Sequence, residues 1–166
     1  MSQPCVYRDF PSGVVLYRAA LLVGTLILGG IVSLEAGGLG LLAYVVVGLT
    51  ALLWTMSHAC RNCAYHGRRC DLGVSLVAAR LFPRGGKPAH FPPLARTALK
   101  WLGAMLALPI ALYAAGLIGV GRRAGPAWLV IYVAMVGIVI ATTATSCPHC
   151  AMRNICPLSF HRDRRA

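Results

Sequence analysis

Four long apolar runs dominate the chain, and short segments rich in glycine, proline and charge separate them. The runs cover residues 14–34, 39–57, 99–120 and 126–146. A helix needs about 20 apolar residues to cross the hydrocarbon core of a bilayer, and each run is of about this length. The pattern therefore predicts an all-α integral membrane protein with four transmembrane helices.

The four predicted helices pair into two tight hairpins. Residues 35–38 separate the first run from the second, and residues 121–125 separate the third from the fourth. Neither connection is long enough to hold a domain. We divide the chain into a first hairpin (1–70), a loop (71–98) and a second hairpin (99–166), which together form one membrane domain.

The loop contains an amphipathic stretch. Apolar side chains recur at helical spacing from Leu72 to Phe82, with Arg80 among them. Such a segment suits a short helix that lies on lipid headgroups. After it, Pro92 and Pro93 are expected to keep the chain extended, and Pro109 is expected to kink the third helix.

The chain is strongly basic, with 16 Lys and Arg against four Asp and Glu and a formal net charge of +12. In a soluble protein this excess would suggest a nucleic-acid partner. Here 58% of the residues are hydrophobic, so we expect contact with a lipid bilayer instead and no nucleic-acid binding. Arg18 and Lys100, near the ends of their spans, are expected to extend to the interface.

The distribution of the basic residues predicts the orientation. Only Arg122 and Arg123 fall in the connection between the third and fourth runs, while fourteen of the sixteen lie on the side shared by both termini and the loop. By the positive-inside rule, that side is cytoplasmic. Thiols on the cytoplasmic side are normally kept reduced, which favours metal or redox chemistry over structural disulfides.

Six of the seven cysteines follow the second and fourth apolar runs on this basic side. The spacings are Cys60-x2-Cys63-x6-Cys70 and Cys147-x2-Cys150-x5-Cys156. Each half is thus a hairpin that ends in C-x-x-C with a third cysteine after it. This layout predicts an internal repeat of the parallel kind, because both hairpins run in the same direction across the membrane.

Two C-x-x-C pairs supply the four thiolates of a tetrahedral zinc site or of an iron–sulfur cluster. In one arrangement a single site joins the hairpins, with Cys70 and Cys156 as outer or replacement ligands, and its four ligands are Cys60, Cys63, Cys147 and Cys150. In the other, each half binds its own ion, and His66 and His161 each join the three cysteines of their half. We favour the bridging site, because it would link hairpins that gain little hydrophobic driving force from meeting in lipid.

The metal is left open by the residue types, with zinc placed slightly ahead of an iron–sulfur cluster. Neighbouring arginines such as Arg61 and Arg153 are expected to lower the pKa values of the thiols. We expect a non-enzymatic protein whose metal site serves structure, metal handling or electron relay with a protein partner or a second copy of the chain.

Two other functions remain open. A membrane thiol-disulfide oxidoreductase would use Cys147 and Cys150, which form the sequence Cys-Pro-His-Cys. This pair follows the C-terminal end of a helix, where the dipole disfavours a thiolate. The third reading is a membrane anchor subunit of a larger complex, in which the cysteine clusters only shape a docking surface.

Overall fold

The computed structural model describes residues 7–86, 90–118, 126–152 and 156. This part of the chain contains helices and turns and no strand. The five α-helices are α1 (Ser12–Ser33), α2 (Gly38–Trp54), α3 (Val74–Leu81), α4 (Phe91–Ile118) and α5 (Ala127–Ser146).

Helices α1, α2, α4 and α5 are long and apolar enough to cross a membrane, which confirms the prediction of four such helices. The largest difference in bounds is at α4, which begins at Phe91 rather than near residue 99. Pro92 and Pro93 were expected to be extended, and this was wrong. Both prolines fall in the first turn of α4, where the missing N–H has no partner to lose and the fixed φ suits a helix.

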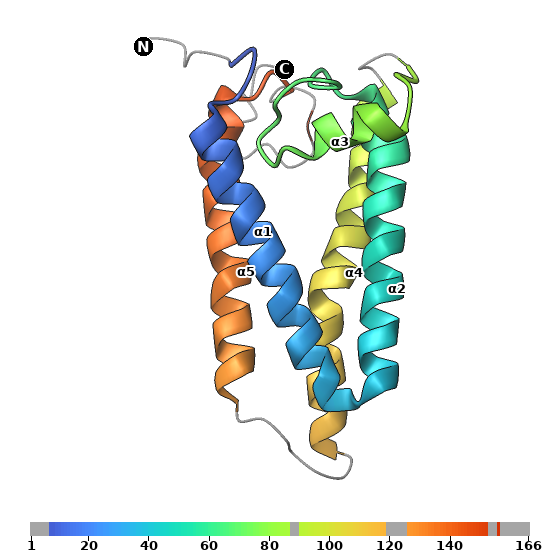
Figure 1. Cartoon of the computed structure of the whole chain (residues 1–166), viewed down its shortest axis with the longest axis vertical. Helices are drawn as coiled ribbons and strands as arrows, with labels where there is room; N and C mark the ends of the chain where they lie inside the picture. The colour runs from blue at the N-terminus through green and yellow to red at the C-terminus, as the bar shows by residue number, and fades with distance from the viewer. Residues whose placement is uncertain (1–6, 87–89, 119–125, 153–155, 157–166) are drawn as a thin grey trace, which may run out of the picture.

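The four long helices pack as two pairs that contact each other, α1 with α5 and α2 with α4 (Figure 1). Each pair combines one helix from each half of the chain. Helix α1 contacts α5 more extensively than its own hairpin partner α2, and α1 also packs along α4. The two halves therefore form one bundle rather than two separate hairpins.

One buried tyrosine joins the two helices of each hairpin. In the first hairpin, the hydroxyl of Tyr44 on α2 donates to the carbonyl oxygen of Leu26 on α1 at 3.2 Å. In the second, the hydroxyl of Tyr132 on α5 donates to the carbonyl oxygen of Leu106 on α4 at 2.9 Å. Both rings are buried, and both polar ends are satisfied, as a buried hydroxyl requires.

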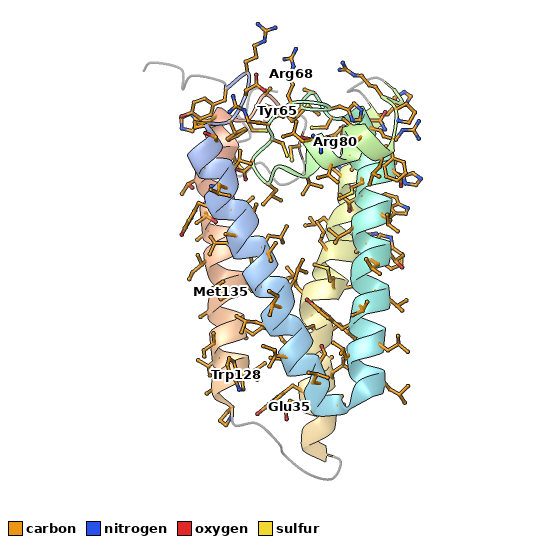
Figure 2. The ribbon with its side chains drawn as sticks, in the orientation of Figure 1. Glu35, Tyr65, Arg68, Arg80, Trp128 and Met135 are labelled. Carbon is orange, nitrogen blue, oxygen red and sulfur yellow. The ribbon has the colours of Figure 1, made fainter. Side chains whose placement is uncertain are left out.

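Gly29 allows the first of these contacts. A Cβ atom at this position would lie 2.5 Å from the Tyr44 hydroxyl and 3.2 Å from the ring of Tyr132. The core of the bundle is thus tight around both tyrosines. The outward faces of the helices carry exposed Leu, Val and Ile side chains along their length (Figure 2), as expected of helices surrounded by lipid.

The ends of α2 and α5 differ by one local feature. Helix α2 continues into a π-helical turn, Thr55–Ala59, before the turn Cys60–Asn62. Helix α5 stays α-helical to Ser146, where the turn Cys147–His149 begins. A π turn accommodates an extra residue. Correspondingly, Tyr44 lies 16 residues before Cys60, whereas Tyr132 lies 15 residues before Cys147.

Candidate functional site

Both C-x-x-C motifs form the same local structure at the same end of the bundle. In each motif a 3-10 turn begins at the first cysteine, and the second cysteine follows it in an extended conformation. The backbone angles are φ −78° and ψ 146° at Cys63, and φ −81° and ψ 132° at Cys150. In each turn the second cysteine donates its backbone N–H to the carbonyl oxygen of the first at 3.2 Å. The backbone therefore holds the two sulfurs of each pair on one turn.

The second sulfur of each motif accepts a hydrogen bond from a backbone amide two residues later. The N–H of Met152 donates to the sulfur of Cys150 at 3.4 Å, and the N–H of Tyr65 donates to that of Cys63. Hydrogen bonds of this kind favour the ionised form of the acceptor and so lower the pKa of the thiol. The same device is present in both halves of the chain.

Tyr65 connects the two turns. Its side chain is buried, and its hydroxyl accepts a hydrogen bond from the backbone N–H of Ala151 at 2.9 Å. The same hydroxyl donates to the carbonyl oxygen of Tyr7 at 2.8 Å. Tyr7 in turn donates its N–H to the carbonyl oxygen of His149 at 3.0 Å. The segment before α1 thus contacts the residues of both cysteine turns.

The thiols of the two halves are close enough for their charges to interact. Cys63 interacts with Cys60 and Cys70 of its own half and with Cys150 and Cys156 of the other. The sulfur of Cys63 therefore lies near cysteines of both halves. All six described cysteines are of intermediate burial.

Burial governs the ionisation of Cys63 and Cys150. It raises the pKa of Cys63 to about 11, with backbone hydrogen bonds opposing the rise and Cys70 adding to it. It likewise raises the pKa of Cys150 to about 11. The expectation that nearby arginines lower these pKa values was wrong for Cys63, because desolvation dominates and Arg61 donates its Nε–H instead to the carbonyl oxygen of Pro83 at 2.9 Å. Desolvation is also the largest cause at Cys150, whose neighbour Arg153 lies outside the described residues.

The remaining predicted ligands are placed as follows. The Nδ1 atom of His66 lies 3.2 Å from the carbonyl oxygen of Cys60, to which it donates. Cys147 donates its S–H to the carbonyl oxygen of Thr143 at 3.5 Å. His161 and Arg153 lie outside the described residues. Within the described ranges, no three Cys, His, Asp or Glu side chains converge closely enough to hold a metal ion.

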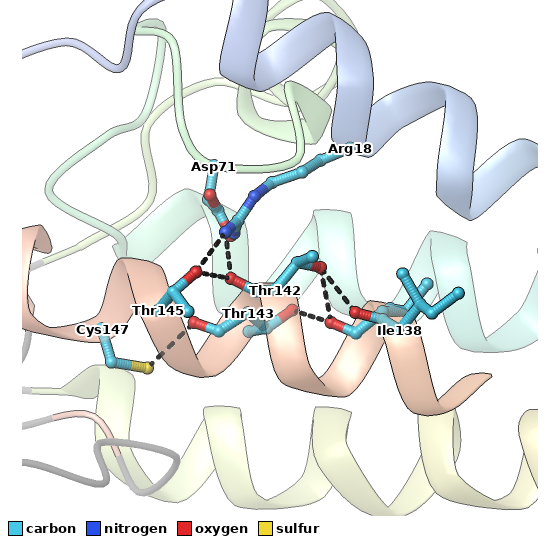
Figure 3. A network of polar contacts seen from close by, with 8 residues as sticks. Arg18, Asp71, Ile138, Thr142, Thr143, Thr145 and Cys147 are labelled. Atoms are coloured by element: carbon cyan, nitrogen blue, oxygen red, sulfur yellow. Dashed lines mark hydrogen bonds and ion pairs between the residues drawn. The ribbon is translucent and has the colours of Figure 1, made fainter. Parts of the chain in front are cut away.

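Sequence reasoning missed an ion pair beneath the cysteine turns. Arg18 was expected to extend to the interface, and this was wrong: its side chain is only 6% exposed and pairs with Asp71, the residue after Cys70. Arg18 also donates to the carbonyl oxygen of Thr142 and, at 3.3 Å, to the hydroxyl of Thr145 (Figure 3). A buried guanidinium needs a carboxylate, and Asp71 supplies it.

This ion pair joins three parts of the chain. Arg18 comes from α1, Asp71 directly follows Cys70, and Thr142 lies in the last turns of α5 (Figure 3). Burial raises the pKa of Asp71, and the charge of Arg18 opposes that rise. Asp71 is the one acidic residue of the loop 71–98, which is the signal that could have identified it as the partner of Arg18.

Comparison of the chain with protein-family models, with curated proteins and with solved structures found no match.

Proposed function

We propose that this protein is an integral membrane protein that binds a metal ion through cysteine thiolates where its two halves meet. One observation carries the proposal. Cys63 and Cys150 occupy turns of the same conformation, accept the same amide hydrogen bond and interact with each other across the two halves. Thiolates presented in pairs on such turns are ligands for zinc and for iron–sulfur clusters.

The ionisation of the thiols is consistent with a site that closes when the ion binds. With pKa values of about 11, Cys63 and Cys150 are protonated at neutral pH in the metal-free protein. Neutral thiols have little reason to converge, and thiolates without a metal repel one another. A divalent ion displaces the protons and draws the sulfurs together, while the amide hydrogen bonds stabilise the charge that develops on them.

The bridging arrangement is favoured over one ion in each half, because Cys63 interacts with cysteines of both halves. We propose the C-x-x-C pairs as the ligands, with Cys70 and Cys156 as replacement ligands. His66 remains a candidate, since it donates Nδ1–H to a backbone carbonyl and leaves Nε2 as its other nitrogen. Metal-ligating histidines commonly have this second hydrogen bond.

The fold supports an internal repeat beneath the site. When the hairpins are exchanged, α1 maps to α4 and α2 maps to α5. The pair α1 with α5 then corresponds to the pair α4 with α2, and these are the two most extensive helix contacts. The bond from Tyr44 to Leu26 corresponds to the bond from Tyr132 to Leu106. The π turn in α2 accounts for the one-residue difference in spacing before the first cysteine of each half.

We assign the site to the cytoplasmic side, with both termini, by the distribution of basic residues. Zinc there would lock the two halves together or pass to a partner. An iron–sulfur cluster there would relay electrons to a partner. In both cases the ion or electron would pass to the partner at the end of the bundle. Neither function requires a charged residue deep in the transmembrane helices.

A thiol oxidoreductase is supported less well. Its reactive cysteine should have a lowered pKa and lie at the N-terminus of a helix. Cys150 has a raised pKa, and Cys147 follows the C-terminal end of α5 and donates its proton to a carbonyl of that helix. Neither environment activates a thiol.

The test is the metal and acid-labile sulfide content of protein purified anaerobically in mild detergent, together with its visible absorption spectrum. Zinc near one equivalent without colour supports the bridging site, and near two supports one site in each half. Iron with sulfide and a broad visible band supports an electron relay. Cys63→Ser and Cys150→Ser should each lower the metal content, whereas Cys5→Ser, outside both clusters, is the matched control. Protein that stays metal-free after zinc is added would overturn the proposal.

A further inference from the structure

Helix α3 presents one buried face and one exposed face at the end of the bundle that carries the cysteine turns. Ser75 and Ala78 form the buried face, at 1% and 0% exposure. The hydroxyl of Ser75 donates to the carbonyl oxygen of Arg68 at 2.8 Å, and the carbonyl oxygen of Ser75 accepts the N–H of Gly67 at 3.5 Å. The segment between Cys63 and Cys70, which we call the cysteine loop, therefore fixes the rotation of α3 about its own axis.

The opposite face of α3 is apolar with basic residues among the apolar ones. Leu76, Val77 and Leu81 are 41%, 49% and 59% exposed. Arg80 is exposed on the same face, and Arg84 is exposed just beyond the helix. No described part of the chain covers these apolar side chains. A helix with this pattern is typical of one that lies in the interface of a bilayer.

Both ends of α3 lie at the level where the transmembrane helices end. Gly73, before α3, lies against Val15, in the first turn of α1, with a Cβ position 3.0 Å from its side chain. Pro83, after α3, accepts the hydrogen bond from Arg61, which follows α2. In Figure 2, Arg80 lies beside the ends of α2 and α4, and Arg68 lies farther out from the bundle. The exposed face is thus at the depth of the lipid headgroups.

We propose that the exposed face of α3 is a binding surface for anionic lipid headgroups. The apolar side chains enter the boundary between headgroups and acyl chains, and Arg80 and Arg84 contact the phosphates. Near a membrane surface each basic residue adds attraction to anionic lipid. Because the buried face of α3 packs on the cysteine loop, lipid bound to the exposed face would also stabilise the conformation of that loop.

The test is hydrogen exchange of residues 74–86 in nanodiscs that each hold one copy of the full chain. Nanodiscs of phosphatidylcholine alone are compared with nanodiscs that also contain phosphatidylglycerol. We expect exchange in α3 to be about tenfold slower in the anionic discs. The double variant Arg80→Gln/Arg84→Gln should lose this difference and exchange alike in both lipids.

The matched control is Arg68→Gln/Arg69→Gln, which removes the same charge from exposed residues of the same end. It should keep the slower exchange in anionic discs. Two results would overturn the proposal: equal exchange of the unmodified chain in both lipids, or equal loss in both double variants, which would show a general charge effect. Protection that appears only when a disc holds two copies would assign the face to a second copy instead. Each outcome is separate from metal content, so the proposed metal site is tested independently.

Discussion

The hydroxyl of Tyr65 accepts a hydrogen bond from the backbone N–H of Ala151, 86 residues away in the chain, at 2.9 Å. It donates at the same time to the carbonyl oxygen of Tyr7. One buried phenol therefore joins the first cysteine turn to the second and to the segment before α1. This contact links the segment after Cys63 to the segment after Cys150.

Tyr65→Phe is expected to loosen the two cysteine turns. It removes two part-buried hydrogen bonds, one to the carbonyl of Tyr7 and one from the amide of Ala151, at a cost of about 2 kcal/mol of unfolding free energy. Thermal unfolding in detergent measures the loss. The variant should also bind metal more weakly, and a competition titration with a chelator measures this. Tyr7→Phe keeps the Tyr7 backbone contacts and serves as the control. Equal behaviour of the two variants would contradict this role of Tyr65.

The ion pair of Arg18 and Asp71 is expected to be essential for the bundle as well as for the loop. Arg18→Met removes the cation from a largely buried pair and should destabilise the protein by about 3–5 kcal/mol. The double variant Arg18→Met/Asp71→Leu removes both charges and should recover much of that loss. Unfolding in denaturant, followed by circular dichroism, measures both. A double variant no more stable than the single one would show that the pair contributes through its hydrogen bonds to α5 rather than through charge.

Gly29→Ala is expected to destabilise the core. The new methyl group would lie 2.5 Å from the Tyr44 hydroxyl, and overpacking of this kind costs about 1–3 kcal/mol. Gly137→Ala is the matched control, because a Cβ at Gly137 meets nothing within 4 Å. The control should be neutral or stabilising, since Ala favours a helix more than Gly does. Melting temperatures in one detergent compare the two variants, and a neutral Gly29→Ala would contradict the tight contact with Tyr44.

Alkylation of the metal-free protein should report the raised pKa values of Cys63 and Cys150. The thiolate is the reactive form, and both groups have pKa values of about 11. Their reaction with iodoacetamide should therefore be slow at pH 8 and rise about tenfold for each pH unit up to pH 10. Mass spectrometry of the digested protein gives the rate at each site. A rate that already levels off near pH 7 would favour the thiol oxidoreductase. Metal-loaded protein should be protected until a chelator is added.

The four spanning helices could be predicted from the sequence because their signal is local. A run of about 20 apolar residues has only one favourable environment, the bilayer core, and there only a helix satisfies its own backbone. The amphipathic helix α3 was also predictable, because the helical spacing of its apolar residues is a local signal too. The start of α4 was not, because Pro92 and Pro93 are compatible with both an extended chain and a first helical turn.

The cysteine spacing by itself determined that each half carries a pair of sulfurs on one turn. What the turns contact was decided by the tertiary structure. The bridge from Tyr65 to Ala151 has no signal in the local sequence, because it joins residues 86 positions apart. The pair of Arg18 and Asp71, 53 positions apart, has only the indirect signal that Asp71 is the one acidic residue of its loop. Likewise, the charges of nearby arginines can be read from the sequence, but the desolvation that raises the pKa of Cys63 arises only when the segments pack together. The sequence alone determined which groups are present and which segments enter the membrane. Packing decided which groups meet, because burial and long-range contact are properties of the folded chain.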